Sequence, residues 1–213
     1  TTVDAGSLRH VESYLEFENN ALLATLAFPL LESIGVDLDL YYTNLTSISF
    51  PALLSVGDDI DTGYNPLLTA LTFPLLETVG GDLLVEYSGL VTLSAPALLI
   101  VEEDVEFTWN ANFTHMLAPL LHTISYDLKL HHNSALTDFV LESLRFVDDI
   151  DVHDNTWASS LRLPVLENAY DIEIYDNTGL GSIEMGTTST FSVSDDLYID
   201  GNAGLQTINM PGL

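Results

Sequence analysis

A proline that recurs at intervals of 22 or 23 residues is the feature that most constrains how this chain can fold. The first five copies each follow Phe or Ala and precede a short apolar stretch: Pro29, Pro51, Pro74, Pro96 and Pro119. Pro164 continues the series two intervals later, and Glu142 occupies the intervening position. A unit of this length cannot bury its apolar face alone, so consecutive units must stack on one another. The period therefore predicts a single repeat domain over residues 1–213.

A second landmark recurs in the same register and identifies the repeating strand. It is a triplet in which two apolar residues flank one outward-facing residue, which is the two-residue period of a half-buried strand. Its nine copies begin at Leu15, Leu38, Ile60, Leu83, Val105, Leu128, Ile150, Ile172 and Leu197. Pairing of each strand with its copy in the next unit predicts a mainly β fold, a right-handed parallel β-solenoid of about nine coils.

The segments around each proline predict how the coil closes. A second short strand is expected just before the proline, most clearly over residues 48–50 and 71–73, and the proline itself marks a corner because it has no N–H to donate. No segment shows ten residues of helical period, so we expect at most short helical turns after the prolines. Met210-Pro211 begins a further unit, and we therefore expect the chain to be a fragment of a longer protein.

The composition excludes several classes of protein. The chain carries 32 Asp and Glu against 4 Lys and Arg, a formal charge of −28, which argues against nucleic acid and anionic membranes as partners. Hydrophobic residues make up 47%, enough for a core and too many for a disordered acidic tail. Cysteine is absent, which excludes disulfides and thiol chemistry. No apolar run is long enough to span a membrane, so no direct membrane insertion is expected.

Two repeat units resemble those of a known family. Residues 45–60 read LTSISFPALLSVGDDI and residues 71–83 read LTFPLLETVGGDL, and both are similar to receptor L-domain repeats. That family is related to leucine-rich repeats, and its members occur in growth-factor receptor ectodomains, fungal cell-wall proteins and microbial surface proteins. The resemblance covers nearly the whole chain. It implies a leucine-rich-repeat-like solenoid at the cell surface, and the lack of cysteine favours a microbial surface protein.

Because equivalent positions of a solenoid stack about 4.8 Å apart, the sequence can be read in columns. One column, three residues after the triplets, is mostly asparagine and is expected to satisfy buried backbone groups: Asn20, Thr43, Asn65, Ser88, Asn110, Asn133, Asn155, Asn177 and Asn202. The column just before the triplets is aspartate: Asp37, Asp59, Asp82, Asp104, Asp127, Asp149, Asp171 and Asp196. These carboxylates either cap turn N–H groups or bind a divalent ion, with Ca²⁺ the possible cofactor.

An aromatic column is the candidate ligand site. It contains Tyr42, Tyr64, Tyr87 and Trp109, and the outward triplet positions Asp39, Asp61 and Glu106 are expected to rim it. Tyr and Trp combine large apolar surfaces with polar tips and are common binding anchors. The alternative is that the rings pack only against one another at a corner of the coil.

Histidine and the few basic residues occupy other outward columns. His131 and His153 are neighbours in one column near Asp151, a candidate metal-ligand set. Lys129, the only lysine, lies between Glu106 and Asp151 in its column, while Arg9, Arg145 and Arg162 each fall one coil from a glutamate: Glu32, Glu167 and Glu184. We expect these opposite charges to pair.

Together these patterns favour a non-enzymatic recognition or adhesion module of an extracellular, cell-surface protein. Its ligand would be a neutral or basic protein or glycan, because an acidic rim repels anionic polymers. The alternatives are a rigid spacer or stalk and a carbohydrate-active β-helix enzyme. Repeat lengths barely vary, which leaves little room for a catalytic cleft, and the one long step contains residues 186–190, either a functional loop or a surface bulge. The oligomeric state is not indicated by the sequence.

Overall fold

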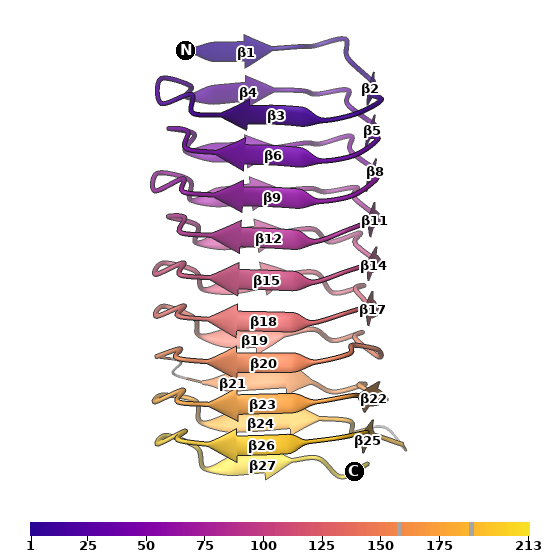
Figure 1. Ribbon diagram of the computed structural model, residues 1–213, viewed down its shortest axis with the longest axis vertical. Helices are drawn as coiled ribbons and strands as arrows, with labels where there is room; N and C mark the ends of the chain where they lie inside the picture. Colours follow the sequence, from indigo (N-terminus) through magenta and orange to yellow (C-terminus); the bar gives the residue numbers. More distant parts are fainter. Residues whose placement is uncertain (157–158, 188–189) are drawn as a thin grey trace.

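The computed structural model describes residues 1–156, 159–187 and 190–213, and in these ranges the chain forms 27 short strands and no helix. The strands wind about one long axis in stacked coils (Figure 1). From the N-terminal end downward, the near strands run to the left and the far strands to the right, which is a right-handed winding (Figure 1). The predicted parallel β-solenoid of about nine coils is confirmed.

The triplets form one nine-stranded parallel sheet, the longest of the molecule. Neighbouring strands pair in register one coil apart, so that Leu38 faces Ile60 and Ile60 faces Leu83. The strands are β3 (Leu15–Glu18), β6 (Leu38–Tyr41), β9 (Ile60–Gly63), β12 (Leu83–Glu86), β15 (Val105–Thr108), β18 (Leu128–His131), β20 (Ile150–His153), β23 (Ile172–Tyr175) and β26 (Leu197–Asp200).

A second face carries the strands expected before the prolines, and each of those prolines lies in the turn that follows its strand. This face is divided into three smaller parallel sheets. Their strands are β1 (Thr2–Asp4), β4 (Thr25–Ala27), β7 (Ser47–Ser49), β10 (Ala70–Thr72), β13 (Thr92–Ser94), β16 (His115–Leu117), β19 (Asp138–Val140), β21 (Ser160–Leu163), β24 (Ser182–Met185) and β27 (Thr207–Asn209).

A third face of very short strands closes each coil, and the sequence analysis did not predict it. A two-residue strand shows no alternation to recognise, and its hydrogen bonds come from the coils above and below. The strands are β2 (His10–Val11), β5 (Ser33–Ile34), β8 (Ser55–Val56), β11 (Thr78–Val79), β14 (Ile100–Val101), β17 (Thr123–Ile124), β22 (Asn168–Ala169) and β25 (Ser192–Val193). At Phe146 only isolated bridges to Thr123 and Asn168 continue this face.

The core is a column of apolar side chains inside the coils. Alternate residues of the nine-stranded sheet point inward, and Leu38, Leu40 and Ile60 have no solvent exposure. The phenylalanines that precede the prolines also stack on one another, with ring centroids 5.8 Å apart for Phe50 and Phe73. Each coil therefore buries its apolar side chains largely against its own copies, as expected for a repeat array.

The asparagine column is a buried ladder of hydrogen bonds, as predicted. Asn65, Asn110, Asn133, Asn155 and Asn177 are at most 1% exposed. Asn133 Oδ1 accepts the backbone N–H of Asn110 at 3.2 Å, and Asn133 Nδ2 donates to the Phe107 carbonyl at 2.8 Å. One amide thus satisfies a donor and an acceptor of the preceding coil, which the backbone at the corner leaves unpaired.

The aspartate column caps backbone groups in the same manner. Asp59 Oδ1 accepts the N–H of Asp82 at 2.7 Å, and Asp82 Oδ1 accepts that of Asp104 at 2.8 Å. The bond repeats along most of the column, which supports the capping interpretation. Two acidic groups, Asp37 with Asp58 and Asp59, and Asp127 with Asp148 and Asp149, bring carboxylate oxygens within 4.8 Å. Calcium binding by these groups stays a prediction.

The predicted charge pairs form for the three arginines, and the prediction for lysine needs a correction. Arg9 pairs with Glu32, Arg145 with Glu167, and Arg162 with Glu184. Lys129 is aligned with Glu106 and Asp151 in the sheet, as expected. Its ammonium group instead contacts Asp104 and Asp127 of the capping column. The long side chain reaches back along its own strand to the capping column, which has a carboxylate in nearly every coil.

Two further expectations concerned a candidate loop and membrane insertion. Of residues 186–190, the candidate loop, Thr188 and Ser189 lie outside the described residues. The described ranges contain no helix long and apolar enough to cross a membrane.

The asparagine ladder gives a direct test of what holds the corner. Asn133→Ala leaves the Asn110 N–H and the Phe107 carbonyl buried without their partner, so it should lower the free energy of unfolding by about 2–4 kcal/mol. Asn20→Ala is the matched control, because Asn20 belongs to the same column but is exposed and should cost under about 1 kcal/mol. Urea unfolding followed by circular dichroism measures both. Equal losses would show that burial of the ladder is not what stabilises the coil.

Candidate ligand-binding face

The corner that follows each strand of the nine-stranded sheet forces one residue into the left-handed backbone region. The residues there have φ between 45° and 57°: Asn19, Tyr42, Tyr64, Tyr87, Trp109, His132, Asp154 and Asp176. Gly201 completes the column at φ 64°. The turn lets the next residue, the ladder asparagine in most coils, point inward. Gly, Asn and Asp adopt this conformation readily, whereas other residues incur about 1–2 kcal/mol each.

The predicted aromatic residues therefore occupy a backbone conformation that Tyr and Trp adopt only at a cost in free energy. Asn19, Asp154, Asp176 and Gly201 make the same corner without a ring. The fold does not need Tyr or Trp there. Something other than backbone geometry must offset the strain in four consecutive coils.

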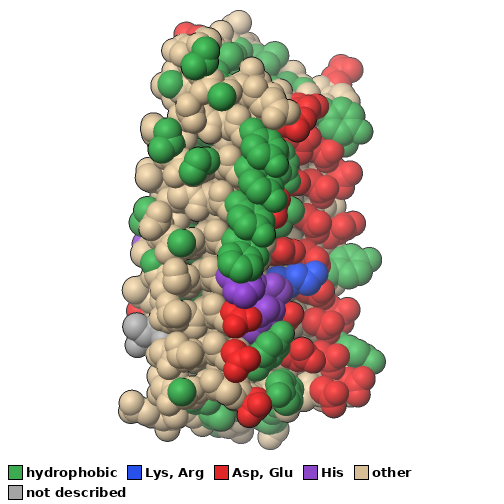
Figure 2. Space-filling view, turned by 60° about the vertical axis from the view of Figure 1, so that its left-hand side comes forward, with side chains coloured by type: hydrophobic (Ala, Val, Ile, Leu, Met, Phe, Trp, Pro, Cys, Tyr) green, Lys and Arg blue, Asp and Glu red, His purple; other side chains and the backbone are tan. Residues whose placement is uncertain are grey.

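The four rings form a continuous exposed stack. Ring centroids are 4.7 Å apart for Tyr42 and Tyr64, 4.8 Å for Tyr64 and Tyr87, and 5.9 Å for Tyr87 and Trp109, with interplanar angles of 17° or less. The side of the molecule in Figure 2 shows them as an unbroken apolar strip beside the acidic columns. His132 continues the stack, its ring centroid 3.9 Å from that of Trp109.

The stack has the properties expected of a packing feature and also those expected of a ligand-binding surface. Offset aromatic pairs contribute about 0.5–1.5 kcal/mol each, enough to offset much of the strain. The four rings nevertheless stay 37–48% exposed. At these separations each ring covers part of the next one, so what solvent meets is a ribbon of ring edges and hydroxyl groups. A ligand would lie along this ribbon rather than slide between the rings.

The predicted acidic residues lie on the same face but are not equivalent. The side chains of the last strand residues, including Tyr41, Glu86 and Thr108, separate them from the stack. Asp39 and the first ring of the stack, Tyr42, line the same hollow of about 420 Å³. Its other lining residues are Glu16, Glu18 and Tyr41. Glu106 is half-buried beside Lys129 and His131, and desolvation raises the pKa of its carboxyl.

Asp61 is covered by a side chain that the sequence analysis did not include. A Cβ on Gly63 would lie 2.4 Å from Tyr41 Cε1, so the absence of a side chain at Gly63 lets the Tyr41 ring lean over this coil toward Asp61. Asp61 Oδ1 is buried and has no hydrogen-bond partner among the described residues. Burial, opposed by the Tyr41 hydroxyl, raises the pKa of Asp61 to about 6, and the nearby Asp39 and Glu86 charges add to the shift. The sequence signal for this arrangement was Gly63 itself, because a glycine at an outward strand position leaves room for a neighbouring side chain.

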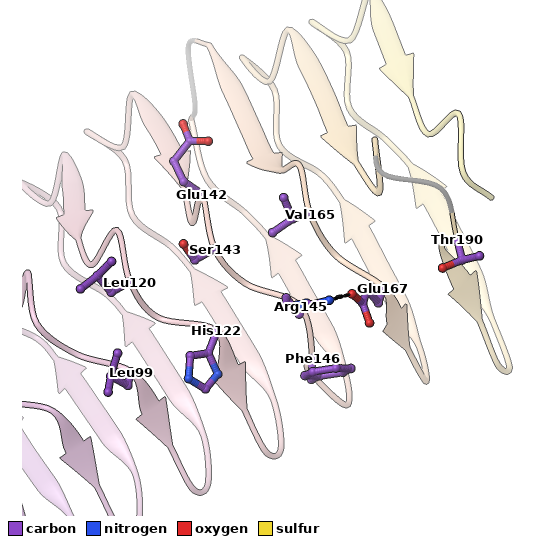
Figure 3. Close-up of a pocket in the computed structure, with 10 residues that line it drawn as sticks. All are labelled: Leu99, Leu120, His122, Glu142, Ser143, Arg145, Phe146, Val165, Glu167 and Thr190. Carbon is purple, nitrogen blue, oxygen red and sulfur yellow. Dashed lines mark hydrogen bonds and ion pairs between the residues drawn. The ribbon is translucent and has the colours of Figure 1, made fainter.

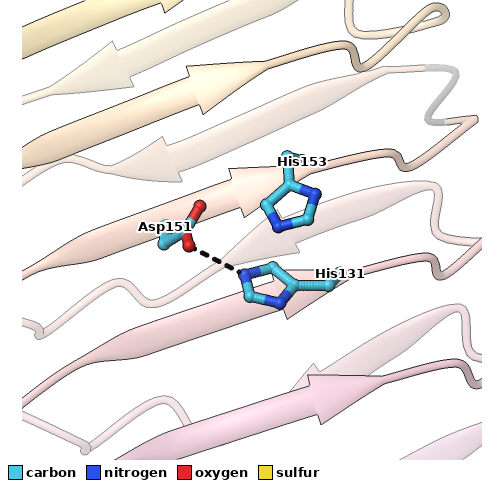
Figure 4. A group of neighbouring side chains, drawn as sticks. All are labelled: His131, Asp151 and His153. Atoms are coloured by element: carbon cyan, nitrogen blue, oxygen red, sulfur yellow. Dashed lines mark ion pairs between the residues drawn. The ribbon is translucent and has the colours of Figure 1, made fainter.

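The histidines predicted as metal ligands are brought together farther along the same face. His131 and His153 stack with centroids 3.9 Å apart, and His131 Nε2 lies 3.2 Å from Asp151 Oδ2 (Figure 4). The cluster begins where the aromatic stack ends, since His132 contacts both Trp109 and His153. The candidate metal residues and the candidate ligand residues therefore form one continuous strip (Figure 2).

A second hollow, of about 860 Å³, lies on another face of the solenoid and was not predicted (Figure 3). It opens where the third face is reduced to the isolated bridges of Phe146, and Glu142 replaces the expected proline at its margin. Arg145 and Glu167 form an ion pair in it, and the Arg145 guanidinium lies 5.9 Å from the Phe146 ring centroid. The Arg145 and Glu167 charges thus already satisfy each other.

No family model matches the chain, and neither the curated proteins nor the solved structures contain a significant match. The resemblance to receptor L-domain repeats stays a prediction from the repeat units.

The pKa of Asp61 gives the stability of this face a defined pH dependence. The pKa is about 6 in the folded chain and about 3.9 in an unfolded one, so ionisation opposes folding, and stability falls as pH rises from about 4 through 6. Asp61→Asn removes this loss and should stabilise the chain at pH 7.5 by about 1–2 kcal/mol, less than the full shift because the carboxyl is partly solvated. At pH 4 the variant and the parent should unfold alike.

Glu12→Gln is the charge-matched control, because Glu12 is exposed at the N-terminal end and its replacement also removes one negative charge. Urea unfolding at the two pH values compares the three chains. An equal gain for both variants at pH 7.5 would mean that general repulsion, rather than the covered Asp61 carboxyl, is relieved.

Proposed function

We propose that the chain is a non-enzymatic recognition module of an extracellular, cell-surface protein, of the receptor L-domain and leucine-rich-repeat type, which binds its ligand along the aromatic stack. The observation that carries the proposal is the placement of Tyr42, Tyr64, Tyr87 and Trp109 at left-handed corners that the fold fills elsewhere with Asn, His, Asp or Gly. Stacking offsets much of the backbone cost, but the corner forms without a ring in other coils and the four rings stay exposed, which supports a surface function.

The geometry suits binding because the rings are already ordered. Each ring of the stack is fixed by its neighbours in the adjacent coils. A ligand would therefore lose little additional side-chain entropy on binding, which is the usual advantage of a preorganised site. The four coils span roughly 15 Å, the length of a short extended peptide or glycan.

The charge of the face selects among ligands. Glu16, Glu18 and Asp39 share the hollow at the Tyr42 end of the stack, with two tyrosine rings beside them. The three carboxylates favour a cation through charge attraction. The ligand is therefore a neutral or basic protein or glycan, and a basic peptide segment fits this hollow best.

The proposal is tested by removing rings without disturbing the corner. Tyr87→Asn with Trp109→Asn replaces two rings by a residue that tolerates the left-handed region, so the solenoid should stay folded. Binding of the best ligand from an array of basic, neutral and acidic peptides and neutral glycans should weaken by at least about tenfold, because truncated aromatic anchors commonly cost more than 1.4 kcal/mol. Fluorescence polarisation at about 0.15 M salt, where long-range attraction is screened, measures the affinity.

Tyr126→Asn with Tyr170→Asn is the matched control, because these two rings are at least as exposed but lie outside the stack. This variant should bind like the parent. Normal binding by the stack variant would place the binding face elsewhere and leave the stack a packing feature. A parent chain that binds nothing on the array would favour the rigid spacer.

A further inference from the structure

The histidine cluster is held by two neighbouring strands of the nine-stranded sheet. His131 ends β18 and His153 ends β20, and the two are register partners. Asp151 lies two residues before His153 on the same outward side of β20. One ligand atom from each of the three side chains lies within 4.8 Å of the other two, and Figure 4 shows the three groups facing one another.

The cluster contains polar atoms that the described residues do not satisfy. His131 Nε2 and Asp151 Oδ1 are both buried and have no hydrogen-bond partner in that part of the chain. His131 Nε2 lies 3.2 Å from Asp151 Oδ2 but is not aligned for a hydrogen bond with it. Unpaired buried nitrogen and carboxylate oxygen atoms are costly, and they are also the ligand atoms that a transition metal uses.

The orientation of His153 is fixed by a second carboxylate. Its Nδ1 lies 2.9 Å from Asp154 Oδ2, and an ionised carboxylate only accepts hydrogen bonds, so in the neutral imidazole the proton belongs on Nδ1 and Nε2 keeps its lone pair. Metal-ligating histidines nearly always donate their other ring N–H to such a partner. Asp154 thus supplies the orienting contact that a metal site requires.

The cluster has acidic neighbours, and the lysine beside it is engaged by other carboxylates. The Glu106 carboxylate lies beside His131 on the same face. Lys129, which shares a column with Asp151, directs its ammonium group to Asp104 and Asp127 instead. Because the Lys129 ammonium group is engaged by these two aspartates, Asp151 has no lysine partner.

We propose that His131 Nε2, His153 Nε2 and the Asp151 carboxylate bind one zinc-like divalent transition-metal ion. Two imidazoles and one carboxylate suit Zn²⁺ and its neighbours, whereas Ca²⁺ and Mg²⁺ prefer oxygen ligands alone. Ligand atoms of a tetrahedral zinc site lie roughly 3.3 Å apart, and the His131–Asp151 pair already has this spacing. Three protein ligands leave the fourth position open at the end of the aromatic stack.

A neighbouring cluster of His132, His153 and Asp154 is the weaker candidate. Its side chains are more exposed, 30% for His132 and 45% for Asp154 against 17% for His131 and 31% for Asp151. Its His153 nitrogen is already engaged by Asp154. The ion is therefore assigned to the His131 cluster.

Titration with Zn²⁺ and with Co²⁺ tests the site. In about 0.15 M salt with excess Mg²⁺, to suppress loose binding to the acidic surface, calorimetry should find one tight site per chain, and Co²⁺ should give the intense visible bands of a four-coordinate ion. His131→Ala, His153→Ala and Asp151→Asn should each weaken Zn²⁺ binding by more than about tenfold and abolish the Co²⁺ bands. Asp154→Asn should weaken binding by about 10–100-fold and keep the bands, because it removes only the orienting contact.

His115→Ala is the control, since His115 is an exposed histidine on the second face and its loss should change nothing. Circular dichroism confirms that each variant is folded. Loss of binding in His132→Ala but not in His131→Ala would move the ion to the neighbouring cluster and overturn the assignment. Equal, weak binding by all variants would show only attraction to the acidic surface, and would leave the peptide and glycan assay unaffected.

Discussion

The parallel pairing of each strand with its copy one coil away is the constraint on which the rest of the structure depends. It fixes a spacing of about 4.8 Å between equivalent residues and places each side chain against its own counterpart. Buried columns benefit, as the inward asparagines and phenylalanines show. Outward columns gain or lose according to what is repeated: aromatic rings stack, whereas carboxylates repel. The raised pKa values of Asp39, Asp59 and Asp61 reflect desolvation and this repetition of like charge.

Much of the fold was predictable because the repeat is read in register many times. The nine strand positions, the proline corners and the inward asparagines follow from the two-residue alternation and the need to satisfy backbone groups, and all were confirmed. The third face was not predictable, because strands such as Ser55–Val56 are too short to carry a pattern. The hollow at Phe146 was missed for a related reason, since it arises from an interruption of that face.

The sequence predicted which residues of the candidate site share a column, but it did not predict which side chains contact one another. Register alone placed Tyr42, Tyr64, Tyr87 and Trp109 in one stack and His131 beside His153. Which way a long side chain turns depends on the neighbouring coils, which explains why Lys129 reaches Asp104 and why Tyr41 covers Asp61. In the first case a flexible side chain is attracted by a nearby carboxylate. In the second a large ring fills the space left by a residue without a side chain, Gly63. The direction of such a side chain depends on its neighbours in space, and the spacing of residues in the sequence does not reveal it.

The left-handed corner accepts Asn, Tyr, Trp, His, Asp and Gly in successive coils while the inward ladder beside it hardly changes. Surface chemistry and core stability are thus encoded at different positions of the same short repeat. Gain or loss of one whole repeat unit, as by recombination between similar copies, would lengthen or shorten the exposed ribbon by one step of about 4.8 Å while keeping every other column in register. The reach of such a surface would evolve in discrete steps, set by the number of coils that carry a ring.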